Sequence, residues 1–204
     1  MGASPTLAVR PEPTRSAPVV RVTLAAGAVA RIPSDTALAV VEEGVLLVRA
    51  TVHGRAALLT IAGAGEVVPT PSKAEALQAA TPVRLRIVSE RELESLLASP
   101  ADTRWLVDGL AAALRDRQDS LAYVAAATHA ERLEAKLIQL ARKHGRVTPR
   151  GIRIDVPLTH QLLAESIGAA RETVTVALRD LRRRGLVVRE GRAYLVQMAP
   201  RSLG

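Results

Sequence analysis

Between residues 19 and 88 the apolar residues come in short, β-branched runs that are separated by turn residues. Glycine and proline divide the runs, for example at Gly44, Gly54 and Pro82. Short strands with frequent turns are typical of an antiparallel sandwich or roll. The predicted strands are 19–24, 37–41, 45–52, 56–61 and 83–88. We therefore expect a small β domain over residues 19–100, preceded by a proline-rich, flexible tail over 1–18.

A helical pattern follows the β pattern. Ser89, with Glu92 three residues later, predicts a capping box and a short helix that closes the roll. Over residues 101–128, apolar residues recur at alternating steps of three and four, as in a coiled coil. The seam that we predict for a dimerisation helix consists of Leu110, Leu114, Arg117, Leu121 and Val124, and the pattern extends to Val107 and Thr128. A core helix packed on its own β domain has the same pattern, so that alternative stays open.

The pattern in residues 158–185 is that of two short helices joined by a tight turn. A helix-turn-helix needs a small residue where its helices touch and a glycine at the turn, and Ala164 and Gly168 supply them. Thr159 is placed to cap the first helix, and Gly185 ends the second after a basic last turn. The apolar contacts to a third helix, predicted over 131–144, are Leu163, Ile167, Ala169, Val174 and Leu178.

Short strands are predicted on both sides of this helix pair. Residues 146–156 alternate between apolar and polar and contain Pro149 and Gly151, which favours a hairpin. After Gly185, residues 186–189 and 192–196 flank a turn at Glu190 and Gly191. The sequence therefore predicts a winged helix-turn-helix domain over 129–204.

The charge is divided unevenly between the two halves. Residues 1–128 hold 13 basic and 13 acidic side chains, whereas residues 129–204 hold 15 basic and 7 acidic ones, which is the entire net charge of +8. A basic surface that only keeps the protein soluble is the alternative. Because the charge coincides with the helix-turn-helix, we predict that this half binds DNA.

Composition excludes several classes of function. The absence of cysteine removes disulfides, zinc fingers and cysteine-ligated iron–sulfur clusters. With no phenylalanine and only three other aromatic residues, base-stacking platforms for single-stranded nucleic acid are nearly excluded. The four histidines are scattered, which argues against a cupin-type metalloenzyme, and no catalytic motif occurs. We expect a cytoplasmic protein that has no membrane span, is not an enzyme and holds no cofactor.

From about His129 to Val196 the chain resembles the DNA-binding domain of the cyclic-AMP receptor protein and FNR-type (CRP/FNR) transcription regulators. The resemblance is most specific over 158–186, where the run from Arg171 to Val174 matches the recognition sequence of the family. It implies an α+β fold with an N-terminal antiparallel β roll that is cyclic-nucleotide-binding-like. A long dimerisation helix and a C-terminal winged helix-turn-helix complete that fold.

The start of a recognition helix faces the floor of the major groove, where arginine can bind guanine and glutamate can accept from cytosine. Arg171, Glu172 and Thr175 are therefore the predicted base-reading residues. The predicted contacts to the DNA backbone are Thr159, Gln161, Thr173, Arg179, Arg189 and Arg192. For each arginine, a solvated surface charge is the alternative.

The chain departs from the family pattern at two places. Val176 stands where family members usually have a second arginine, so we expect an operator that differs from the familiar half-site. In the β domain the candidate effector pocket comprises Gly65, Glu66 and Lys73. No arginine stands where the phosphate of a cyclic nucleotide needs one, and Glu75 would repel that phosphate. We expect no ordinary response to cyclic AMP.

These inferences predict a homodimeric transcription regulator on double-stranded DNA, with RNA polymerase as a further partner. Two-fold symmetry places the recognition helices about 34 Å apart, so the operator is expected to be an inverted repeat. An unknown small-molecule effector, constitutive DNA binding and control through abundance all stay open. The alternative function is a partner-binding dimer that has lost specific operator recognition.

Overall fold

The computed structural model describes residues 19–126 and 128–197, so the predicted tail lies outside the described residues. The chain divides into two compact units. Of the described residues, one unit comprises 19–47 and 61–113, and the other comprises 48–60, 114–126 and 128–197.

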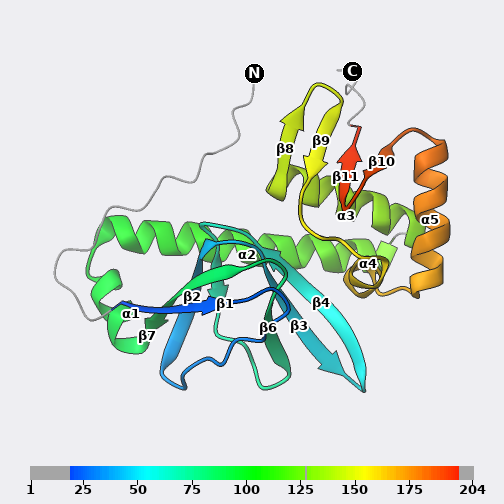
Figure 1. Cartoon of the computed structure of the whole chain (residues 1–204). Helices are drawn as coiled ribbons and strands as arrows, with labels where there is room; N and C mark the ends of the chain where they lie inside the picture. Colours follow the sequence, from blue (N-terminus) through cyan, green and yellow to red (C-terminus); the bar gives the residue numbers. More distant parts are fainter. Residues whose placement is uncertain (1–18, 127, 198–204) are drawn as a thin grey trace. The chain divides into compact units, whose positions relative to one another are not determined.

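Two antiparallel sheets form the N-terminal half (Figure 1). One sheet has the strand order β1-β7-β2-β5 and the other the order β4-β3-β6. The strands are β1 (Val20–Leu24), β2 (Thr36–Glu43), β3 (Leu46–Val52), β4 (Arg55–Ala62), β5 (Val67–Pro69), β6 (Glu75–Ala79) and β7 (Val83–Ser89). All five predicted strands are present, together with two short ones, β5 and β6, that the sequence pattern did not reveal. Pro69 fits in β5 because this strand lies at a sheet edge, where a missing N–H costs little.

Two helices follow the sheets, α1 (Glu90–Leu97) and α2 (Pro100–Ala126). Ser89 caps α1 as predicted, since its hydroxyl accepts a 3.2 Å hydrogen bond from the Glu92 backbone N–H, but the predicted capping box is not completed, because the Glu92 carboxylate does not bond back to the Ser89 N–H. The Glu92 carboxylate forms a buried ion pair with Arg86 of β7 and so joins α1 to the sheet. One buried apolar cluster joins side chains of the sheet to side chains of α1 and α2; it consists of Leu38, Val40, Val67, Val88, Leu96 and Leu106.

The end of the long helix differs from the prediction. The α2 helix ends at Ala126, and Thr128 is the N-cap of the next helix, α3 (His129–His144), rather than a seam residue. The Thr128 hydroxyl accepts from the Glu131 N–H, while the Glu131 carboxylate accepts from the Thr128 N–H at 2.8 Å. This reciprocal pair of bonds stabilises a helix start. The apolar periodicity of the sequence therefore continues from one helix into the start of the next.

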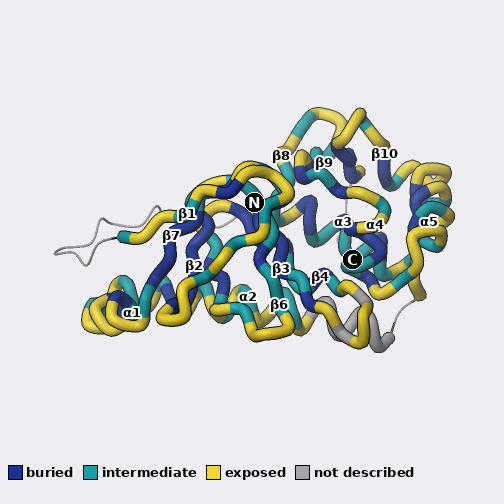
Figure 2. The backbone as a smooth tube through the Cα atoms, turned by 60° about the horizontal axis from the view of Figure 1, so that its bottom comes forward, coloured by how far each residue is buried: buried dark blue, intermediate teal, exposed yellow. Residues whose placement is uncertain are grey.

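The C-terminal residues form three helices and a four-stranded sheet. The elements after α3 are β8 (Gly145–Thr148), β9 (Gly151–Ile154), α4 (His160–Ile167), α5 (Arg171–Arg183), β10 (Val187–Glu190) and β11 (Ala193–Val196). The sheet has the antiparallel order β10-β11-β9-β8. Helices α3, α4 and α5 contact one another around side chains such as Leu133, Leu163 and Leu178, each at most 1% exposed. Figure 2 shows how the buried sides of these helices face inward. The predicted winged helix-turn-helix is confirmed.

Candidate nucleic-acid interface

Helices α4 and α5 are joined by the predicted turn. The Thr159 hydroxyl caps α4 by accepting a 3.0 Å bond from the Leu162 N–H. Gly168 ends α4 with φ 64° and ψ 40°, a left-handed conformation that glycine adopts without steric cost. Ala164 is 2% exposed, and its carbonyl accepts from the Ala169 N–H beyond the turn. Thr159, Ala164 and Gly168 therefore have the local roles that the sequence predicts.

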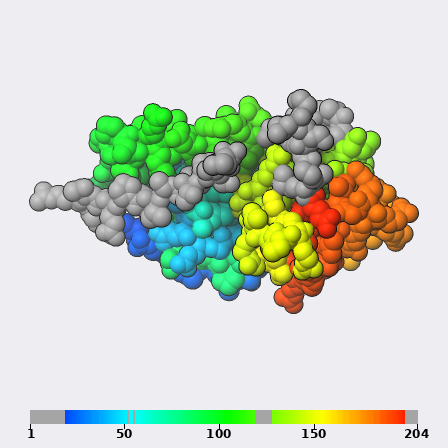
Figure 3. All heavy atoms as spheres, turned by 90° about the horizontal axis from the view of Figure 1, so that it is seen from above, coloured from blue at the N-terminus to red at the C-terminus, as the bar shows by residue number. Residues whose placement is uncertain are grey.

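The recognition helix α5 is amphipathic. Its buried side chains, Val174, Ala177, Leu178 and Leu181, define the side that packs on the core. At 3.6 residues per turn, the line opposite that side carries Glu172, Val176, Arg179 and Arg183. Arg171, Thr175 and Arg182 flank this line on one side, and Thr173 and Asp180 flank it on the other. We call these nine residues, which are exposed or half-exposed, the outer face of α5. The helix itself is the orange segment in the space-filling view of Figure 3.

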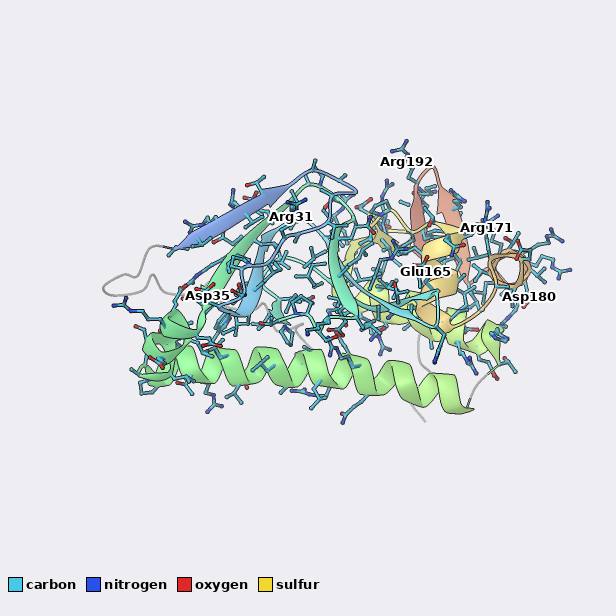
Figure 4. All side chains as sticks on the ribbon, turned by 90° about the horizontal axis from the view of Figure 1, so that it is seen from below. Arg31, Asp35, Glu165, Arg171, Asp180 and Arg192 are labelled. Atoms are coloured by element: carbon cyan, nitrogen blue, oxygen red, sulfur yellow. The ribbon has the colours of Figure 1, made fainter. Side chains whose placement is uncertain are left out.

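Several predicted DNA-binding arginines are exposed and available. Arg171, Arg179 and Arg192 have no ion-pair partner within the part of the chain that the structure describes. Arg192 lies at the turn of the wing and Arg171 at the start of α5, and both extend outward in Figure 4. Arg189 is held more firmly, because its Nε donates a 3.1 Å bond to the Gly191 carbonyl and its guanidinium lies 5.7 Å from the Tyr194 ring centroid.

Thr175 makes contacts that the sequence analysis missed. Its hydroxyl donates to the Arg171 carbonyl at 3.0 Å and also lies 2.9 Å from Nδ1 of His160 in α4. The single hydroxyl hydrogen is used by the carbonyl, so Nδ1 of His160 carries a hydrogen and donates to the Thr175 hydroxyl. Burial, together with Arg189, Arg182 and Arg171, lowers the pKa of His160 below its ordinary value of 6.5. His160 thus connects α4 to α5 in its uncharged state.

The predicted backbone-contacting residue Gln161 belongs to a chain of contacts on α4. Its amide donates a 3.1 Å bond to Glu165, and the same carboxylate pairs with Arg49 of β3, whose Nε lies 3.0 Å from Oε2. The Glu165 side chain is 6% exposed, so its charge needs this partner. Contacts at so large a sequence separation carry no signal that a search for motifs can find.

A hollow of about 510 Å³ lies beside the outer face of α5. It is lined by Ala130, Glu172, Thr173, Val176, Ala177 and Asp180. This lining combines two carboxylates and a hydroxyl with apolar side chains, and none of the described lining residues is basic. The hollow therefore differs in character from the arginine-rich flank of the same helix.

The candidate effector residues lie in loops of the β roll. Gly65 has φ 86°, and its N–H donates to the Val41 carbonyl at 2.8 Å, while Val41 in turn donates to the Glu66 carbonyl. Lys73 is exposed. In the same loop, the Glu75 carboxylate accepts a 2.8 Å hydrogen bond from the Ser72 N–H. The protein's own carboxylate therefore uses a backbone donor that could otherwise bind an anionic ligand.

The predicted dimer seam is exposed where its side chains are described. Leu110 is 40% and Leu114 57% exposed, and Arg117 is half-buried. The side chains of Leu121 and Val124 lie outside the described residues.

Among residues 19–126 and 128–197, no helix is long and apolar enough to cross a membrane. The same residues contain no cluster of His, Cys, Asp or Glu that could hold a metal ion.

Comparison with known proteins gives consistent matches. A family model described as a Crp-like helix-turn-helix domain matches residues 131–201. The chain is 30% identical over 177 residues to the CRP-like cAMP-activated global transcriptional regulator of Mycobacterium tuberculosis, covering 83% of this chain and 79% of the relative. It is 36% identical over 108 residues to the global nitrogen regulator of Synechocystis sp., covering 52% of this chain and 48% of that protein.

Solved structures share the fold at lower identity. A CooA mutant from Carboxydothermus hydrogenoformans superimposes with a TM-score of 0.76 at 22% identity, covering 88% of this chain and 84% of CooA. FixK2 from Bradyrhizobium japonicum gives a TM-score of 0.75 at 19% identity, covering 89% of this chain and 94% of FixK2. These likenesses support the observed fold, with its β roll, long helix and winged helix-turn-helix.

Proposed function

Because the chain belongs to the CRP/FNR family of DNA-binding transcription regulators, we propose that it acts as a homodimer which reads an inverted-repeat operator through α5. The observation that carries this proposal is the outer face of α5. There Arg171 and Arg179 are exposed and have no ion-pair partner among residues 19–126 and 128–197, whereas the opposite side of the helix is buried in the core. Rigidly positioned, unpaired guanidinium groups are suited to bases and phosphates.

The roles proposed on DNA follow from position. Arg171 donates to guanine and Glu172 accepts from the amino group of cytosine, since both lie in the first turn of α5. Thr175 uses its hydroxyl within the protein, so it offers its methyl group to the bases. The residues proposed to contact the DNA backbone are Thr159, Gln161, Thr173, Arg179, Arg189 and Arg192.

The proposed dimer is formed through α2. Leu110 and Leu114 are large apolar side chains exposed on one side of this helix, together with Val107, which is 58% exposed. Apolar surface repeating along a helix is stabilised when a second helix covers it. Two-fold dimers are the commonest assembly and produce an inverted-repeat operator.

Cyclic AMP is not the proposed effector in its usual binding mode, although the relative from M. tuberculosis is named as cAMP-activated. In the loop that would receive the phosphate, the Glu75 carboxylate is bound to the Ser72 N–H and repels a second anion. Lys73, which is exposed, is the proposed residue to hold a different ligand, together with Gly65 and Glu66 of the preceding turn in the chain. Titration calorimetry with cyclic AMP is expected to give no heat of binding at micromolar ligand.

The regulator is proposed to work with RNA polymerase and to have no enzymatic activity of its own. The test of the whole proposal is selection of binding sites from a random duplex pool by the purified, effector-free protein. We expect an inverted repeat with half-site centres separated by one helical turn. Enrichment of single, unpaired half-sites would contradict the dimer, and sequence-blind binding would favour a dimer that has lost operator recognition.

A further inference from the structure

Val176 occupies the centre of the outer face of α5. It is 62% exposed, and it lies one turn after Glu172 and three residues before Arg179, on the line opposite the buried core. A single exposed valine on a protein surface needs no explanation. On a helix that presents this line to DNA, however, its side chain faces the base edges rather than bulk water.

The hollow on one side of Val176 is less suited to phosphate than the arginine-bearing side of α5. Its described lining residues include no basic side chain, and they include the carboxylates of Glu172, which repels anions, and of Asp180, which pairs with Arg183 and Arg184 at 3.6 and 3.7 Å. The methyl groups of Thr173 and Ala177 add apolar surface to the same hollow. The chemistry that fits this lining is an apolar group for Val176, with a hydrogen-bond donor on the same base pair for the carboxylate of Glu172.

In the major groove, one base pair offers an apolar group. The C5 methyl of thymine lies beside thymine O4, and the adenine amino group that pairs with this O4 lies next to it; guanine instead presents two acceptors. If the two guanine acceptors faced Val176, they would lose bound water without gaining a hydrogen-bond donor, and the nearby Glu172 carboxylate would repel them.

We propose that Val176 is a specificity-determining residue that reads the C5 methyl group of a thymine in each operator half-site. This inference rests on the proposed function, because it requires α5 to lie in the major groove. It deepens that function by naming the base class read at the centre of the helix. Because 5-methylcytosine presents the same methyl group, the site is expected to distinguish methylated from unmethylated cytosine at this position.

The experiment uses the operator selected from the random pool, with each thymine replaced singly by deoxyuridine. This exchange removes only the methyl group. At one thymine position per half-site we expect affinity to fall about fourfold, the effect of losing one buried methyl group, and about fifteenfold when both half-sites are changed. Replacing that thymine by cytosine is expected to weaken binding, and 5-methylcytosine is expected to restore part of the loss.

The V176A variant links the effect to this residue. It is expected to bind the thymine and deoxyuridine operators with nearly equal affinity. The matched control is V147A, which truncates a valine that is 81% exposed in β8 and away from α5. V147A is expected to retain the full fourfold effect.

The outcomes separate the inference from the proposed function. A specific operator whose thymines all tolerate deoxyuridine overturns the role of Val176 and leaves the proposed function standing. A methyl effect that persists unchanged in V176A overturns it as well, since another side chain then reads the thymine. A pool without any enriched sequence overturns the proposed function and this inference with it.

Discussion

His160 Nδ1 lies 2.9 Å from Thr175 Oγ1 and joins the first helix of the helix-turn-helix to its recognition helix. The Thr175 hydroxyl also bonds the Arg171 carbonyl in the first turn of α5. The other ring nitrogen of His160, Nε2, is buried and has no hydrogen-bond partner among the described residues. The arrangement therefore favours the neutral imidazole.

This pair predicts a pH dependence of stability. The pKa of His160 is lowered in the folded protein by burial and by three arginines, so the unfolded chain takes up a proton first on acidification. Stability is complete above about pH 6.5, the ordinary histidine value, and falls as the pH drops below it. Thermal unfolding between pH 7.5 and 5 is expected to show a steeper fall in Tm for the wild type than for H160N, whose amide keeps the donor to Thr175. Parallel curves for the two proteins would contradict the role of His160.

Arg171 and Arg179 are predicted to contribute differently to DNA binding. R171A is expected to relax the preference at one base pair per half-site and to weaken specific binding by about 1–3 kcal/mol per half-site. R179A is expected to weaken binding to all sequences equally and to reduce the salt slope by about one unit per half-site, because it loses a phosphate contact. Affinities for selected and random duplexes at two salt concentrations measure both effects. Identical behaviour of the two variants would contradict this assignment.

The ion pair between Arg49 and Glu165 is predicted to stabilise α4. R49A leaves the nearly buried Glu165 carboxylate without its partner and is expected to lower the free energy of unfolding by about 2 kcal/mol. E165Q in the R49A background is expected to recover part of that loss, because a neutral amide costs less to bury. Urea unfolding of the two single variants and the double variant gives the coupling energy. Strict additivity would mean that the contact contributes nothing.

The exposed apolar side of α2 is predicted to be a dimer interface. L114D places a charge at a position that is 57% exposed in the single chain and is expected to shift the protein to monomers at micromolar concentration. L97D, at a leucine of α1 that is 53% exposed, is the matched control and is expected to stay dimeric. Sedimentation equilibrium distinguishes the two variants. A wild type that is monomeric at high concentration would overturn the interface itself.

Lys136 of α3 is predicted to destabilise the folded state at neutral pH. Burial lowers the pKa of Lys136 to about 8, although Asp116 opposes the shift, and Lys136 donates a 2.8 Å bond to Gln139. The folded protein thus loses this proton near pH 8, whereas the unfolded chain holds it to about pH 10.5. K136M is expected to be more stable than the wild type at pH 7, with a difference that shrinks as the pH rises from 8 to 10. A difference that is constant with pH would contradict the shifted pKa.

Local signals predicted the DNA-binding half well. Thr159 caps α4 by a hydrogen bond to a residue within one helical turn, and Gly168 ends α4 through its own left-handed backbone conformation. Their roles can therefore be predicted from the adjacent residues in the sequence. The apolar spacing of α5 likewise defines its buried side before any partner is known. The outer face of α5 then follows, because it consists of the residues on the sides of the helix that are not buried.

Other features depended on pairing that a linear pattern does not contain. Strands β5 and β6 come from a segment whose proline and glycine content is typical of a loop. They form strands because they pair with the edges of β2 and β3. Thr128 continues the apolar periodicity of α2, yet its bonds to Glu131 start a new helix. Periodicity records which side is buried but does not record where one helix stops and the next begins.

The sequence by itself determined the class of fold, the helix-turn-helix and which side of α5 is buried, because short-range hydrogen bonds and apolar periodicity decide them; the DNA-reading roles of the residues on the other side stay predictions. Only the tertiary structure decided that His160 bonds Thr175, that Glu165 pairs with Arg49, and that Val176 borders a hollow without basic residues. Each of these contacts joins separate elements of the chain. Their side chains meet because burial of the core brings the elements together, and that packing is a property of the whole chain rather than of any local pattern.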